Sequence, residues 1–197
     1  HTQKPEVPKD LVKMEYTDEE KVRIGKYLER VKREPVKFKS GKGSSANPVI
    51  DLHTTDRTAT AAKLTEALGT PDAELQKFLI NQVVQTFRGC VLAEGFDNSK
   101  MAEYANNAMA LLSGIQPKDE IEGMLAIQMI AVHNMAMETM KRAMITGQTF
   151  EGQEANVNRA TKMLRTFTAQ MEALQRYRTG GQQKVIVEHV HVNKGGQ

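Results

Sequence analysis

The chain has 197 residues, of which 40% are hydrophobic and 26% charged, and its formal net charge is only +3. This composition is that of an ordinary globular protein, and 11 Met with no Trp favour helices over a β-sandwich. A single cysteine, Cys90, excludes an internal disulfide framework and indicates a reducing compartment, so we expect the cytoplasm. No apolar run approaches the roughly 18 to 20 residues needed to span a bilayer, and no membrane association is expected.

Residues 1–56 are predicted to form a basic N-terminal arm. The positive excess lies in this region, because residues 1–43 hold 12 Lys and Arg against 8 Asp and Glu. A short helix is predicted after Thr17, a plausible N-cap, and it ends before Pro35. Two short β-like pieces, 36–39 and 49–53, follow on either side of a Gly/Ser-rich linker. We expect the boundary between arm and core within this region.

Residues 57–179 are predicted to form an all-α helical bundle. Helical spacing and capping signals place five helices at 57–68, 71–92, 99–112, 117–145 and 151–178. The fourth has no charge between residues 123 and 137 and predicts the buried central rod of the bundle. The fifth carries a seam with alternating spacings of three and four, made by Val157, Ala160, Leu164, Phe167, Met171 and Leu174. The short turn between these two helices predicts that they pack antiparallel.

The period changes after Gly180-Gly181, where residues 184–192 predict a β-strand within a terminal segment, 180–197. A strand must pair its backbone groups, and this chain offers few partners. The leading interpretation is pairing between subunits, which makes the segment an oligomerisation strand. The alternatives are pairing with the β-like pieces near Phe38 and Ile50, or with a partner protein. The predicted oligomerisation residues are Val185, Ile186, Val187, His189, Val190, His191 and Val192.

Motifs for catalysis are missing from the sequence. It has no Gly-x-Ser-x-Gly elbow, no dinucleotide fingerprint and no cysteine pair for zinc, so we expect neither an enzyme nor a cofactor. His133, in the fourth predicted helix, is interpreted as a hydrogen-bonded core histidine, with an acid–base role in an internal pocket as the alternative. His189 and His191 have the spacing of two metal ligands but lack a third, and no metal is expected.

Basic residues around one aromatic ring form a candidate nucleic-acid surface on the arm. Its members are Arg30, Lys32, Arg33, Lys37, Phe38, Lys39 and Lys42. The cations would contact phosphates and the ring of Phe38 would stack on a base, whereas the simpler alternative is a solvated charged face.

Three stretches, 120–133, 166–174 and 176–197, resemble a widespread proteobacterial family of uncharacterised helical proteins that end in a Val/His strand flanked by Gly-Gly-Gln. The likeness covers about residues 64–197. It implies no function, so no catalytic or binding residue is carried over from it.

Together these patterns predict a non-enzymatic, homo-oligomeric accessory or scaffold protein that acts through assembly and partner binding. Its expected partners are copies of itself and another protein, with DNA as a further candidate through the arm. The alternative is a nucleic-acid-binding ring protein that resembles a viral small terminase subunit, a likeness of architecture alone.

Overall fold

The computed structural model describes residues 16–42, 50–52, 56–88 and 98–180, and the chain divides into two compact units, 1–35 and 36–197. In the first unit, α1 (Asp18–Lys32) is the helix predicted after Thr17. The backbone N–H of Glu20 donates to the Thr17 hydroxyl, and the Glu20 carboxylate accepts from the Thr17 backbone N–H at 2.8 Å. This reciprocal capping box satisfies two donors that the first turn would otherwise leave unpaired.

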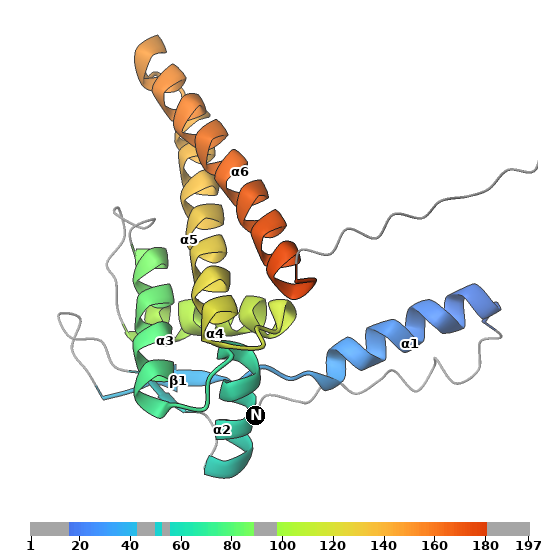
Figure 1. Ribbon diagram of the computed structural model, residues 1–197. Helices are drawn as coiled ribbons and strands as arrows, with labels where there is room; N and C mark the ends of the chain where they lie inside the picture. Colours follow the sequence, from blue (N-terminus) through green and yellow to red (C-terminus); the bar gives the residue numbers. More distant parts are fainter. Residues whose placement is uncertain (1–15, 43–49, 53–55, 89–97, 181–197) are drawn as a thin grey trace, which may run out of the picture. The chain divides into compact units, whose positions relative to one another are not determined.

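The second unit is mostly helical with one small sheet (Figure 1). Its elements are β1 (Phe38–Ser40), β2 (Ile50–Leu52), α2 (Arg57–Leu68), α3 (Ala73–Arg88), α4 (Asn98–Ile115), α5 (Glu120–Ala143) and α6 (Phe150–Arg178). The five helices predicted for the bundle are therefore confirmed. The two β-like pieces are also confirmed as strands, and they pair with each other in an antiparallel sheet.

The sheet belongs with the helices and not with the arm. The side chain of Asn106 on α4 accepts the backbone N–H of Phe38 at 2.7 Å and donates to its carbonyl at 3.0 Å. The Phe38 ring enters the common core and is 9% exposed. The compact units accordingly divide after Pro35, so β1 and β2, which were assigned to the arm, lie in the second unit.

The core lies between α2, α3, α4 and the first half of α5, with β1 on one side. Its buried side chains are Val36, Phe38, Ala67, Leu68, Leu79, Val83, Val84, Met101, Ala105, Ala108, Met109, Leu112, Ala126, Ile127 and Ile130. Two glycines bring the end of α2 against the start of α5. A Cβ on Gly123 would overlap the carbonyl oxygen of Leu68, and one on Gly69, whose φ is +73°, would overlap the carbonyl oxygen of Asp119. Only glycine allows this approach of the two backbones.

α6 contributes no residue to this core. Among the described elements it packs against α5 alone, and the two form an antiparallel hairpin, as predicted. Gly147, with φ at +83°, makes the turn, and the Gln148 side chain donates to the carbonyls of Arg142, Ala143 and Ile145 at the end of α5. In Figure 1 the second half of α5 and most of α6 extend beyond α3 and α4.

The prediction of a buried rod is wrong for the second half of α5. Its first half is covered by the body, with Ala126, Ile127 and Ile130 in the core. In Figure 1 α3 ends alongside the middle of α5. His133, in the second half of α5, is exposed. His133 is therefore not the core histidine that the uncharged sequence suggested. An apolar helix side is buried only where another element reaches it.

Candidate assembly surface

Four apolar side chains recur every seven residues along α6 and stay exposed. We call Phe150, Val157, Leu164 and Met171 the α6 stripe; their exposed fractions run from 40% to 74%. Seven residues make about two helical turns, so the four share one face. The predicted seam is thus covered only in part: Ala160 and Leu174 are buried against α5, while Val157, Leu164 and Met171 face outward.

A second exposed stripe lies on α5 and its C-cap residue, Met144. We call His133, Met137, Met140 and Met144 the α5 stripe; their spacings of three and four place them on one face, and Met144 is 82% exposed. The imidazole of His133 contacts the ring of Phe167 on α6, with centroids 6.1 Å apart. Phe167 lies three residues after Leu164 and four before Met171, so this contact joins the two stripes. We call the joined surface the hairpin face.

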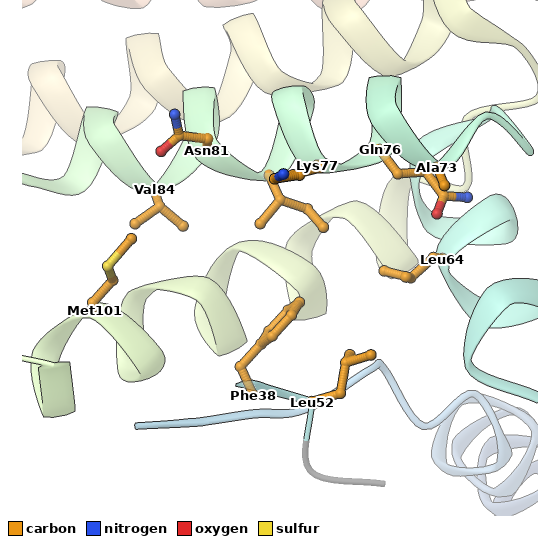
Figure 2. A pocket seen from close by; sticks show the side chains of 10 residues that line it. Phe38, Leu52, Leu64, Ala73, Gln76, Lys77, Asn81, Val84 and Met101 are labelled. Carbon is orange, nitrogen blue, oxygen red and sulfur yellow. The ribbon is translucent and has the colours of Figure 1, made fainter. Parts of the chain in front are cut away.

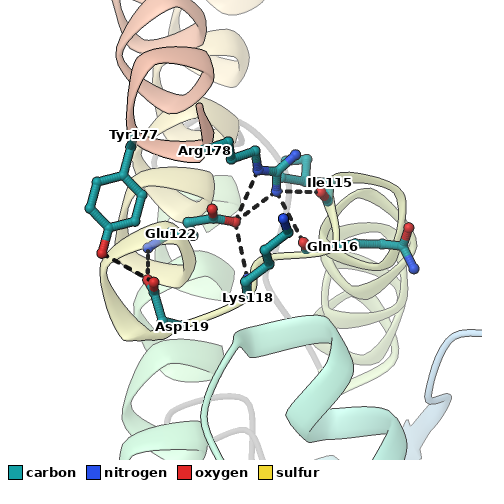
Figure 3. A network of polar contacts seen from close by, with 7 residues as sticks. All are labelled: Ile115, Gln116, Lys118, Asp119, Glu122, Tyr177 and Arg178. Carbon is teal, nitrogen blue, oxygen red and sulfur yellow. Dashed lines mark hydrogen bonds and ion pairs between the residues drawn. The ribbon is translucent and has the colours of Figure 1, made fainter. Parts of the chain in front are cut away.

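An ion pair fixes the open end of the hairpin to the body (Figure 3). The guanidinium of Arg178, at the end of α6, donates to the Glu122 carboxylate at 2.8 and 3.0 Å and to the carbonyls of Ile115 and Gln116 at 2.9 and 3.0 Å. Glu122 is 2% exposed and also accepts the backbone N–H of Lys118 at 3.0 Å. These contacts give hydrogen-bond donors both to a buried carboxylate and to two backbone carbonyls at the C-terminal end of α4.

The pKa values around this ion pair follow from the same contacts. The hydrogen bond from Arg178 lowers the pKa of Glu122 below its usual 4.5, against burial, which acts in the opposite direction. Tyr177 donates its phenol hydrogen to Asp119 at 3.1 Å, and this bond raises the pKa of Tyr177. Glu122 is therefore ionised at neutral pH, as the ion pair requires.

This ion pair was missed by sequence reasoning. From the sequence alone, Glu122 is one of several acidic residues that suit the first turn of a helix. The available signal was the antiparallel pairing of α5 with α6, because the first turn of one helix then lies beside the last turn of the other. A carboxylate in the first turn of α5 and an arginine in the last turn of α6 are therefore candidates for an ion pair.

A largely apolar cavity of about 460 Å³ opens between the sheet, α2, α3 and α4 (Figure 2). It is lined by Phe38, Leu52, Leu64, Ala73, Gln76, Lys77, Ile80, Asn81, Val84 and Met101. In Figure 2 the Phe38 ring and the Leu52 and Leu64 side chains point into the space below α3. Among these lining residues Lys77 is the one titratable group, so they provide no acid–base pair for catalysis.

The predicted nucleic-acid residues separate by their burial. Arg30, Lys32 and Arg33 are exposed around the end of α1, in the first unit, and Lys32 pairs with Glu29 at 2.9 Å. In the second unit Lys37, Lys39 and Lys42 are exposed, but Phe38 between them is buried. The expectation of an exposed stacking ring at Phe38 is therefore corrected. Strand alternation directs this ring inward and its lysine neighbours outward.

The predicted oligomerisation strand, Val185 to Val192, lies outside the described residues, as do His189, His191 and Cys90. Within the described part of the chain, no three His, Cys, Asp or Glu side chains gather where they could hold a metal ion. No helix in that part of the chain is both long enough and apolar enough to cross a bilayer.

Comparisons with known proteins gave no match: neither the protein-family models, nor the curated proteins, nor the solved structures contain a significant relative of this chain. The resemblance of its C-terminal part to a proteobacterial family thus stays a prediction.

Proposed function

We propose that this protein is a non-enzymatic, homo-oligomeric accessory or scaffold protein that acts by assembling with copies of itself and with a partner protein. The observation that carries the proposal is the hairpin face, where large apolar side chains of two helices are exposed to solvent. Exposed apolar surface of this extent is typical of interaction sites, since its burial is the main driving force of association.

A second part of the proposal concerns the C-terminal segment, which would form strands that pair between subunits. Support for it comes from the apolar, β-branched residues on both of its faces, because a lone strand of this kind would aggregate. α6 ends at Arg178, which is bound to the body, so the segment begins from an anchored position.

Native mass tests the proposal most directly. We expect light scattering on the full chain at micromolar concentration to give a multiple of the 22.0 kDa monomer mass. A monomer under these conditions would contradict the proposed function.

Adding duplex DNA at low salt should leave the particle mass unchanged. A mass increase that disappears steeply as salt is raised would instead favour the nucleic-acid-binding ring protein.

Removal of the C-terminal segment is expected to lower the native mass without unfolding the helices. A chain cut after Thr179 retains all the core residues and the Arg178 contacts, so its circular dichroism at 222 nm should stay helical. Light scattering should then give a smaller particle than the full chain. An unchanged particle mass would show that the segment does not set the subunit number.

A further inference from the structure

The α6 stripe has the period of a helix that packs against another helix. Its members repeat every seven residues, which is the 3.5-residue period of supercoiled helix pairs. α5 already occupies the neighbouring flank of α6, where Ala160 and Leu174 are buried. The exposed flank therefore has the spacing that a further helical partner requires.

Mostly uncharged side chains border the α6 stripe. Thr161, Thr168 and Gln175 lie four residues beyond Val157, Leu164 and Met171, and the one charged residue at this spacing is Glu154, four residues beyond Phe150 at the start of α6. In a contact between identical surfaces, a charged border would meet its own copy and repel it. The uncharged border beside Val157, Leu164 and Met171 removes this cost along most of the α6 stripe, and the charged positions at the same spacing, Glu154 on α6 and Lys141 on α5, lie toward the turn of the hairpin.

The hairpin face is two helices wide, because the contact between His133 and Phe167 joins the α5 stripe to the α6 stripe. A single partner helix would cover the groove between the stripes or one side of it. A second hairpin would cover both stripes and complete a four-helix bundle. The width of the face thus matches the width of the hairpin itself.

The area of the face is also that of a dimer contact. Seven of its members, all except His133, are large apolar side chains with exposed fractions between 40% and 82%. At the area that a large side chain offers, they expose on the order of 700 Å². A standard interface buries about 800 Å² on each partner, whereas the largest apolar patch of a monomer is about 300–600 Å².

We infer that the hairpin face is the contact surface between two copies of this chain, whose α5–α6 hairpins pack together as a four-helix bundle. The inference rests on the proposed function, for which it supplies the surface. A second copy is the occupant because a second hairpin matches the face in period, in width and in area. This contact is separate from the C-terminal segment and survives its removal.

A charge placed in the middle of the α6 stripe tests the inference. Leu164→Glu introduces a carboxylate that the contact would bury twice, once from each copy. We expect the dissociation constant between subunits to rise at least about 100-fold, measured by sedimentation equilibrium on the full chain. The matched control is Ala169→Glu, the same substitution at an exposed position on the opposite side of α6, and it should leave the dissociation constant unchanged.

The outcomes separate the inference from the proposed function. If the wild-type chain is monomeric, both fail. If it is oligomeric and Leu164→Glu leaves the dissociation constant unchanged, the inference fails, while assembly through the C-terminal segment stands. Equal loss in Leu164→Glu and Ala169→Glu would also overturn the inference. Should Leu164→Glu lose its helical circular dichroism, Met140→Glu on the α5 stripe replaces it, with the same expected loss and the same contradicting result.

Discussion

Gly123→Ala is expected to destabilise the folded protein by about 3 kcal/mol. The added carbon would overlap the carbonyl oxygen of Leu68. This obstacle is backbone, which cannot rotate away as a side chain would. The end of α2 and the start of α5 must therefore separate, and the packing of Leu68, Leu79 and Ala126 in the core between them would loosen.

Gly114→Ala is the matched control, because Gly114 lies in α4 with nothing within 4 Å of an added Cβ. Alanine is the better helix former there, so stability should stay equal or rise by about 0.5 kcal/mol. Urea unfolding followed at 222 nm, at one fixed protein concentration, compares the two variants with wild type. Equal stabilities for Gly123→Ala and Gly114→Ala would contradict the close approach of α2 and α5.

Local signals predicted the helices well because each helix carries its own start and stop. Gly69 ends α2 in the left-handed conformation, as its place after Leu68 indicated. Asp119 is the N-cap of α5, so this helix begins at Glu120 and not at residue 117 as predicted, and Thr149 caps α6. The predicted end of α4 at residue 112, before Gly114, is wrong, since α4 continues through Gly114 to Ile115 and ends where Gln116 adopts a φ of +52°. Glycine permits a helix stop but does not require one.

Burial was harder to predict, because it depends on where other elements end. The uncharged stretch of α5 has one sequence character throughout, yet Ile130 is in the core and His133 is exposed. The sequence gives no sign that α3 stops alongside the middle of α5. The same limit applies to Phe38, whose basic neighbours suggested a surface ring while Asn106 holds its backbone against α4. Both errors concern tertiary packing, which local sequence propensity does not predict.

Three residues of the candidate assembly surface were predicted as an apolar seam, whereas their exposure, Phe150 and the α5 stripe were not predicted. Alternating spacings of three and four identified Val157, Leu164 and Met171 as a seam. The seam was assigned to α5, whereas α5 covers only the flank that contains Ala160 and Leu174. One apolar stripe on a long helix can pack against two neighbouring elements, and periodicity alone does not tell how many partners share it.

Arg178→Ala is expected to cost about 2 to 3 kcal/mol of unfolding free energy at neutral pH. The substitution leaves the Glu122 carboxylate buried and charged, and the backbone N–H of Lys118 is then its remaining hydrogen-bond donor outside α5. The backbone carbonyls of Ile115 and Gln116 also lose the hydrogen bonds that Arg178 donates to them. Loss of one partner from a buried ion pair costs about 3 to 5 kcal/mol, and the lower value applies because Arg178 is 30% exposed. Arg176→Ala, which removes an exposed neighbour in the same turn, should change stability by less than about 0.5 kcal/mol.

The loss of stability caused by Arg178→Ala should also depend on pH, and the direction of this dependence follows from the pKa of Glu122. In the wild type the pKa of Glu122 is lowered by Arg178, so its stabilisation is fully present above about pH 4.5 and is lost as the pH falls through the lower folded value. In the variant, burial without the guanidinium favours the protonated acid. The stability difference between wild type and Arg178→Ala should therefore shrink from pH 7 toward pH 4 in urea unfolding experiments. A difference that stays constant over this range would place the effect of Arg178 in its carbonyl contacts and not in the ion pair.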